Sequence, residues 1–450
     1  MKPTAILAGL TIGLGTASPM SAQTGVFNPE LFTLDNGLTV AVVTNRLSPV
    51  VTHMIWYGVG ATDEPPGYSG LAHVLEHMMF KGTIENPDLD FGAEVSRLGG
   101  NDNAQTHWDY TVYFQSIAVD RLAEVMAMEA ERMTDLQLDE AEFLTERDVV
   151  VEERRQRIDN DPSARLTELM TTALYMNHPY GTPIIGWEHE IAALEPADLQ
   201  AFYETWYAPN NAVVVISGDI DAATARPLVE AAYGEIPSAP VPERVVLEEP
   251  DIAGHFRVSV SDPGVHQVQW RRWYLAPSYV TDPADIAPAL DVAVQAFGGD
   301  SSSRMYRDLV VDRQLATSAG AYYSSDGRDG GNVILYATPR PDVDPQMLEQ
   351  AIEEVVAQTL ETGLGGDDVA RAREQLIIAA TYARDSVYYP ARVVGSTLIT
   401  GGTVEQLEAW PERIAAVDAE AASAALREIL AADRSVTGTL LPPSADDNAS

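Results

Sequence analysis

The sequence contains no cysteine and almost no lysine. The absence of cysteine from 450 residues excludes disulfides, thiolate metal ligands and a cysteine nucleophile. Lys2 and Lys81 are the only lysines, and every other basic residue is arginine, a bias that we interpret as compositional. Beyond residue 22, no segment is apolar over the ~20 residues that a membrane-spanning helix needs. The sequence therefore predicts no membrane span.

Positive charge is also scarce. The chain has 28 Lys and Arg against 67 Asp and Glu, which gives a formal net charge of −39 at pH 7. Such a chain repels phosphate backbones and attracts cationic peptides, so we expect no nucleic-acid partner. Hydrophobic residues make up 46% of the chain and charged residues 21%. This balance is typical of a globular protein and not of a disordered one.

Residues 1–22 have the pattern of a secretory signal peptide. Lys2 supplies a positive end, residues 6–17 form a short apolar run, and small residues precede Gln23. The alternative is a buried N-terminal helix. A signal peptide predicts a periplasmic or secreted protein, and a chain without cysteine is compatible with that location.

Strand and helix patterns alternate along the rest of the chain and are interrupted by one Pro- and Glu-rich segment. An Asn-Gly turn at Asn36 separates two β-rich runs, which predicts a hairpin. Residues 237–254 have no steady period and are predicted to be a linker. The order of elements then repeats, which predicts a domain over residues 26–236 and a similar one over residues 255–442. The predicted fold class is α+β, with two similar domains, each a mostly antiparallel sheet covered by helices.

Individual elements can also be predicted from the apolar patterns. Strand patterns occur at residues 50–61, 105–117, 213–217, 265–274 and 332–337. Helix patterns occur at residues 69–79, 93–98, 121–134, 140–158, 287–298, 302–309, 345–363 and 367–388.

One short string, His-Val-Leu-Glu-His, has the pattern of a metal site. His73 and His77 are four residues apart, so a helix places both imidazoles on one face, with Glu76 beside them. Two neutral imidazoles at this spacing suit Zn²⁺, and the carboxylate is placed to take a proton from an attacking water. The string is the inverted form of the zinc-peptidase helix motif. An amphipathic helix with two hydrogen-bonded histidines is the alternative.

A catalytic zinc usually has a third protein ligand, and the charged helix predicted at residues 140–158 offers four glutamates. Glu146 and Glu153 are two turns apart on one face, whereas Glu152 points roughly 100° away from Glu153. Glu142 is the fourth candidate. The spacing does not choose among them, and a solvated helix with glutamates paired to arginines is the alternative.

The sequence resembles the pitrilysin/insulinase family of zinc peptidases, in the short-subunit branch that contains mitochondrial processing peptidase and its bacterial relatives. The matching motifs follow one another in order between Leu31 and Asp221: GLAHVLEHMMFKGT, GGNDNAQTHWDYTVYF, ERDVVVEE, HPYGTPIIGWEHEI and YAPNNAVVVISGDID. This ordered agreement is far more specific than the five-residue string alone.

The resemblance implies a role for several individual residues. One Zn²⁺ per chain would be held by His73, His77 and Glu153, with Glu76 as the general base and Glu146 as a supporting acidic residue. An edge strand would bind the substrate backbone by strand addition; its residues are Asn103, Ala104, Gln105 and Thr106.

The second half resembles the non-catalytic repeat of the family, with residues 301–323 as its marker, but it departs from the family pattern at two positions. Active sites in this family usually include an Arg and a Tyr, seven residues apart, from the C-terminal repeat or from a partner subunit. Here the alignment places Val310 and Thr317 at those positions, and neither can donate as Arg and Tyr would. We therefore expect a homologous second subunit that supplies this pair, in a heterodimer.

Together these features predict a zinc-dependent endopeptidase that cleaves peptides or unfolded polypeptide segments, as the metal-bearing subunit of a two-chain enzyme. A catalytically idle peptide-binding or scaffold subunit of the same family is the alternative. A non-proteolytic metal-binding protein is a third reading, in which Glu76 would be idle. Among the other histidines, His53 and His178 are expected to be structural, and His107 either structural or substrate-facing.

Overall fold

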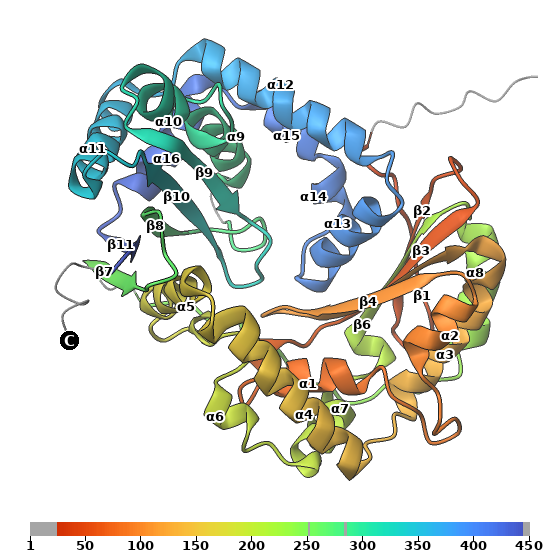
Figure 1. Cartoon of the computed structure of the whole chain (residues 1–450). Helices are drawn as coiled ribbons and strands as arrows, with labels where there is room; N and C mark the ends of the chain where they lie inside the picture. Colours follow the sequence, from red (N-terminus) through yellow and green to blue (C-terminus); the bar gives the residue numbers. More distant parts are fainter. Residues whose placement is uncertain (1–24, 251–252, 283–285, 444–450) are drawn as a thin grey trace, which may run out of the picture.

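Two β-sheets and the helices around them make up the computed structural model, which describes residues 25–250, 253–282 and 286–443 (Figure 1). The predicted signal peptide at residues 1–22 lies outside the described residues. Within the described ranges, no helix combines the length and the apolar character needed to cross a membrane.

The first sheet has six strands in the order β1-β2-β6-β3-β5-β4. β2 and β6 are parallel, and the other neighbours are antiparallel. β4 lies at one edge, so within the described chain its outer backbone groups have no partner strand. The strands are β1 (Glu30–Thr33), β2 (Thr39–Thr44), β3 (Val50–Tyr57), β4 (Asn101–Thr106), β5 (Thr111–Ala118) and β6 (Ala212–Gly218).

Helices of the first half cover one face of this sheet. Side chains that alternate along β3, such as Val51 and Ile55, pack there against Val74 and Leu75 of α1 in one buried core. The helices are α1 (Leu71–Met78), α2 (Phe91–Arg97), α3 (Leu122–Thr134), α4 (Glu140–Arg154), α6 (Glu188–Ile191), α7 (Pro196–Trp206) and α8 (Ala222–Tyr233).

The second sheet has five strands in the order β7-β11-β8-β10-β9, with β7 parallel to β11. This is the order of the first sheet without β1, and β9 takes the edge place of β4. The α+β prediction with two similar domains is therefore confirmed. The strands are β7 (Gly254–Ser261), β8 (Gln269–Ala276), β9 (Ala316–Ser324), β10 (Gly331–Pro339) and β11 (Arg434–Leu441).

The C-terminal domain has its own helical layer. In it α9 occupies the place of α1, between a central strand and the edge strand, and contains neither His nor Glu. The metal-site string therefore has no counterpart in the second repeat. The helices are α9 (Ala287–Gly298), α10 (Arg304–Tyr306), α11 (Pro345–Thr362), α12 (Gly366–Ala383), α15 (Trp410–Ala416) and α16 (Ala419–Leu430).

One helix of each half packs on the sheet of the other half. α5 (Pro162–Leu174) buries Leu166 and Met170 against Trp273 and Ile334 of the C-terminal sheet. The C-terminal half in turn contributes a helix to the first sheet. The chain returns along α12 to the N-terminal domain, where α13 lies beside that sheet (Figure 1). The two domains are thus interlocked at two places.

α13 (Tyr388–Ile399) covers the face of the first sheet that the N-terminal helices leave open. Its Ala391 and Val394 are fully buried against Met54 and Trp56 of β3. The short α14 (Val404–Glu408) then leads the chain back to α15. The core of the N-terminal domain is therefore completed by residues of the C-terminal half.

Three sequence predictions differ from the observed elements. The strand predicted at residues 105–117 is two strands, because the chain turns at residues 107–110, where His107 N donates to Tyr110 O. Three strands of the second sheet, β7, β9 and β11, were not predicted, nor was any element after residue 388. β9 is rich in Ala, Ser and Gly, which are poor strand formers, and most of β7 is exposed or half-buried. The helix predicted at residues 367–388 ends at Ala383.

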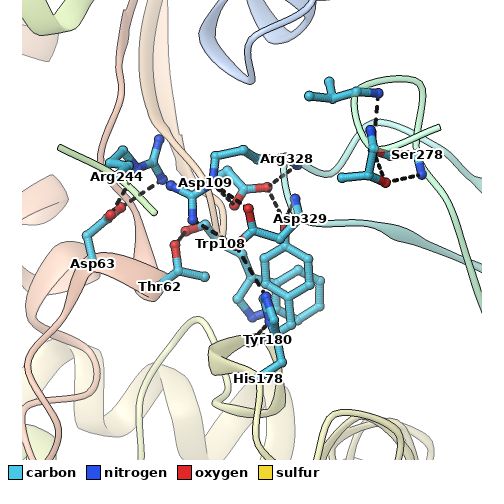
Figure 2. A network of polar contacts seen from close by, with 12 residues as sticks. Thr62, Asp63, Trp108, Asp109, His178, Tyr180, Arg244, Ser278, Arg328 and Asp329 are labelled. Carbon is cyan, nitrogen blue, oxygen red and sulfur yellow. Dashed lines mark hydrogen bonds and ion pairs between the residues drawn. The ribbon is translucent and has the colours of Figure 1, made fainter. Parts of the chain in front are cut away.

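The turn between β9 and β10 reaches the N-terminal domain close to the end of β4 (Figure 2). Asp109 Oδ2 accepts hydrogen bonds from Arg328 N at 3.0 Å and from Tyr180 Oη at 2.6 Å. The Asp329 carboxylate lies 3.2 Å from His178 Nε2 and also accepts from Arg328. Burial would raise the pKa of Asp329, but the hydrogen bonds of His178 and Arg328 outweigh it and lower the pKa to about 2. These contacts give His178 a structural role and fix the β4–β5 turn against the C-terminal domain.

Candidate metal centre

α1 is held at both of its ends by charged side chains. At its start, the Glu64 carboxylate accepts from Gly70 N at 3.1 Å and from Ala72 N at 2.8 Å, which satisfies free N–H groups of the first turn. Just after its end, Arg132 donates to Met79 O at 3.0 Å. The helix therefore presents its side chains from a fixed position.

His73 and His77 share the face of α1 that is turned away from the core. Their ring centroids are 5.0 Å apart, and the ring planes are nearly perpendicular. Val74, Leu75 and Met78 of the same helix are buried in the core. The helix is thus amphipathic, as the alternative interpretation proposed, and its polar face carries both imidazoles.

α4 supplies the carboxylates beside the two histidines. Glu153 Oε2 lies 3.4 Å from His77 Nε2 and 3.8 Å from His73 Nε2, and one ligand atom from each residue lies within 4.8 Å of the others. Glu152 is directed to Arg155 at the surface, and Glu142 is exposed in the first turn of α4. Of the four glutamates left open by the sequence, the structure brings Glu153 to both imidazoles.

The donor set fits a divalent metal such as zinc. Glu146 Oε2 lies 3.1 Å from His77 Nδ1, so a proton on Nδ1 leaves the Nε2 lone pair directed to Glu153 and His73. Burial, with the neighbouring charge of His77, lowers the pKa of His73 to about 4, which keeps that imidazole neutral at pH 7. The hydrogen bond with His77 lowers the pKa of Glu153, and the proton in that bond is the one that a bound metal would displace. Two imidazole nitrogens and one carboxylate are a typical ligand set for Zn²⁺.

Lys81 lies behind His77, in contact with the same supporting glutamate. Lys81 Nζ is 2.6 Å from Glu146 Oε1, while the other oxygen of Glu146 faces His77. Burial would raise the pKa of Glu146, but Lys81 and His77 outweigh it and lower the pKa. The composition alone does not predict this position of Lys81. The rarity of lysine was the signal in the sequence that could have indicated a role for Lys81. Nearly all other basic residues are arginine, yet a lysine stands close to the metal-site string.

Glu76 lies on the same helix and contacts the edge strand. Its Oε2 accepts a hydrogen bond from Thr106 Oγ1 at 2.5 Å. Burial raises the pKa of Glu76, and the hydrogen bond of Thr106 opposes that shift. A carboxyl group with a raised pKa can take up and release a proton more readily near neutral pH.

A cleft of about 590 Å³ opens between these residues and α5. Three of the four residues predicted to bind a substrate backbone line it, namely Ala104, Gln105 and Thr106. Asn103 is exposed and lies outside the lining. The lining also includes His73, Glu76, Trp108, Glu153, Ser163 and Thr167. The unpaired edge of β4 therefore borders the candidate metal centre.

The other histidines and the two aligned positions of the second repeat lie elsewhere. His53 is buried, with Gln115 at 3.0 Å and Tyr233 at 3.2 Å from its ring nitrogens. His107 stacks on Tyr110 with ring centroids 4.7 Å apart. Val310 packs against the C-terminal core and Thr317 is exposed on β9, and neither lines the cleft.

Two family models match the chain. Residues 39–188 match a model described as Insulinase (Peptidase family M16), and residues 193–376 match one described as Peptidase M16 inactive domain. The first match contains α1 and α4 with the candidate metal centre. The second covers most of the C-terminal domain, in which the metal-site string has no counterpart.

Individual relatives agree with these matches. The chain is 31% identical to the zinc protease PqqE of Helicobacter pylori over 348 residues, which cover 76% of this chain and 77% of the relative. It is 27% identical to the mitochondrial-processing peptidase subunit beta of Blastocladiella emersonii over 86% of this chain and 84% of the relative. The crystal structure of a protease from Helicobacter pylori superimposes with a TM-score of 0.84 at 26% identity, covering 92% of this chain and 99% of that one.

Proposed function

The chain belongs to the insulinase family of peptidases, peptidase family M16, and on that premise we propose that it is a zinc-dependent endopeptidase acting at the cleft beside α1 and β4. One observation carries the proposal: two imidazole nitrogens and a Glu153 oxygen converge next to a buried carboxyl group and a free strand edge. This combination provides for metal binding, proton transfer and backbone recognition within one cleft.

Each residue of the centre has a proposed role. His73, His77 and Glu153 hold the metal, and Glu146 keeps His77 in the tautomer that offers Nε2. Zinc, when bound, lowers the pKa of a coordinated water to ~7 and polarises the peptide carbonyl. Glu76 accepts the proton of the attacking water and passes it to the leaving nitrogen, and the Thr106 hydroxyl orients the Glu76 carboxylate.

The substrate is proposed to lie extended along the outer edge of β4. Within the described chain the outer edge of residues 103–106 has no partner strand, so it can pair with one more. The Ala104 N–H, which donates to Asn103 Oδ1 at 2.8 Å, would exchange that hydrogen bond for one to the substrate. A folded protein seldom offers a free extended segment, so peptides and unfolded segments are the proposed substrates. The formal charge of −39 favours basic segments among them.

We further propose that a homologous second subunit supplies the missing Arg and Tyr, and that the enzyme is periplasmic or secreted. The partner proposal is supported by Val310 and Thr317, which cannot act as the family's Arg and Tyr do. A relative named as a subunit of a processing peptidase agrees with it. The location rests on the signal peptide predicted at residues 1–22.

A catalytically idle peptide-binding subunit is the second candidate function. It is favoured by the match of residues 193–376 to an inactive domain. That match does not reach Glu76 or the three proposed ligands, which all lie within the insulinase match at residues 39–188. We therefore prefer the peptidase.

Cleavage of a quenched, unstructured basic peptide, measured on the same sample as its zinc content, tests the function. We expect about one zinc per chain with weak cleavage by this chain alone, because the Arg/Tyr pair is absent. Addition of a homologous chain that carries the pair is expected to raise the rate. A chain that binds no zinc would contradict the peptidase. Fast cleavage by this chain alone would contradict the need for a partner.

Replacement of Lys81 by methionine is expected to weaken zinc binding by about 10–100-fold, the usual cost of losing an outer partner of a metal ligand. Without the ammonium group, Glu146 loses the contact on Oε1 that directs its other oxygen to His77. Competition with a chelator measures the affinity without any activity assay. Arg121→Met, which removes a charge from the exposed pair with Glu124, is the matched control. Equal affinities of the two variants would contradict a role for Lys81.

A further inference from the structure

The open face of the C-terminal sheet forms a second pocket, of about 380 Å³, next to the metal cleft. The side chains of alternate residues on β8, β9 and β10 point to this face. α5 covers another part of the same face with its apolar residues, and the pocket is the part that α5 leaves open. Its lining includes Gln269, Arg271, Trp273, Tyr322, Ile334, Tyr336 and Thr338.

The register of the strands brings aromatic side chains to Arg271. Tyr336 of β10 is paired with Arg271 of β8 on one side and with Gly320 of β9 on the other. A Cβ at residue 320 would lie 2.5 Å from the Tyr336 hydroxyl, so glycine leaves the room that this side chain occupies. Tyr322 and Tyr336 remain 50% and 38% exposed. The pocket is therefore partly open to solvent, and its aromatic side chains lie next to one guanidinium group.

Among the described residues that line this pocket, Arg271 is the only charged one. Its guanidinium donates to three neutral oxygens, Thr167 Oγ1 at 2.8 Å, Ser163 Oγ at 2.6 Å and Gln269 Oε1 at 2.8 Å. These bonds leave two of its five N–H donors free. The charge of Asp161 acts on Arg271, but among the described residues no ion pair or hydrogen bond joins the two side chains. The Asp161 carboxylate accepts from the N–H groups at the start of α5 instead.

The two pockets meet at the first turns of α5. Thr167 lines both of them, and Ser163 lines the metal cleft. The hydroxyl groups of these same two residues accept from Arg271. In Figure 1, α5 lies between the end of β4 and the C-terminal sheet. A peptide that leaves the edge of β4 can therefore cross α5 and reach the guanidinium group.

We propose that this second pocket is a subsite for one carboxylate of the peptide substrate, bound by Arg271 and flanked by Tyr322 and Tyr336. The inference rests on the proposed function. A free, partly buried guanidinium group in a chain of net charge −39 is suited to a carboxylate, which comes either from an Asp or Glu side chain or from the C-terminus of the peptide. The net negative charge of the molecule repels acidic chains, so the rest of the bound segment is expected to be basic. The single carboxylate in this pocket would then fix the position of the peptide along the edge of β4.

Direct binding of labelled peptides to the Glu76→Gln protein tests the subsite without cleavage. One set of equal-length basic peptides carries a single Glu, moved along the sequence, and each has a Gln counterpart. A second set differs only in a C-terminal acid or amide. We expect the peptide with its carboxylate at one particular position to bind about tenfold tighter than the peptide with the neutral group there. This is the difference expected for one charge-assisted hydrogen bond. The set in which the difference appears identifies the source of the carboxylate.

Substitution of the arginine makes the test specific. Arg271→Gln is expected to remove the tenfold preference, and Arg271→Lys to retain part of it if the fold is intact. Arg257→Gln, which removes an exposed arginine of β7 paired with Glu349, is the charge-matched control and should keep the preference. A preference that survives in Arg271→Gln, or peptide binding with no preference at any position, would overturn the subsite alone. Absence of all peptide binding would overturn the proposed function as well.

Discussion

Replacement of Glu76 by glutamine is expected to lower kcat by about 10²–10⁴-fold, the usual contribution of a general base. The amide is nearly the same size and can still accept from the Thr106 hydroxyl, but it cannot take a proton from the attacking water. Zinc content and melting temperature should stay at the level of the parent protein, because Glu76 is not among the three converging ligand atoms. The measurement is cleavage of the quenched peptide, with zinc quantified in the same sample.

A matched control separates catalysis from the loss of one negative charge. Glu94→Gln on α2 removes a half-buried carboxylate that pairs with Arg97, and it should leave the rate unchanged. Full activity of Glu76→Gln would rule out its role as the base. Such a result would also revive the third reading of the sequence, a metal-binding protein that does not cleave peptides.

Glu153→Gln is expected to lower zinc affinity by more than about 10²-fold, which exceeds the loss expected for an outer partner such as Lys81. The amide oxygen carries no net charge, so the donor set loses its only anionic member next to His73 and His77. Cleavage should fall in parallel and should recover in part at high zinc concentration. A chelator competition gives the affinity, and thermal unfolding with and without zinc gives an independent reading.

The neighbouring residue on α4 provides the control for this substitution. Glu152 has the same charge but is directed to Arg155 at the surface, so Glu152→Gln should bind zinc as the parent protein does. If both variants bind zinc equally well, Glu153 is not a ligand. Stabilisation by zinc that is lost in Glu153→Gln but kept in Glu152→Gln would support the assignment without any activity measurement.

The sequence was sufficient for the local part of the site and insufficient for the part that depends on packing. The helical repeat places His73, Glu76 and His77 together, because residues three and four apart share a face. Glu153 follows His77 by 76 positions, and only the contact of α4 with α1 distinguishes it from Glu142 and Glu152. The resemblance to a known family identified Glu153 as the expected third ligand, whereas residue spacing alone left four glutamates possible.

The C-terminal pocket could not be predicted for a related reason. β9 is rich in Ala, Ser and Gly, which have little strand preference, so no strand was predicted on which to place Tyr322. Two of the three hydrogen-bond partners of Arg271, Thr167 and Ser163, come from α5, more than a hundred residues earlier in the chain. Likewise, α13 was not predicted, and an apolar helix face does not by itself say which sheet it covers.

The interlocking of the two domains has a consequence for the order in which the protein matures. A chain that emerges from the ribosome or from a translocon with its N-terminus first presents β3 long before α13, so Met54 and Trp56 stay uncovered until residue 399 has appeared. The C-terminal sheet waits longer still, because β11, at residues 434–441, lies between β7 and β8. The first half cannot complete its core until most of the second half has been synthesised, and the second half cannot do so until β11 has appeared. The cleft beside α1 is therefore completed late, because α5, which lines it, packs on β11 of the C-terminal sheet.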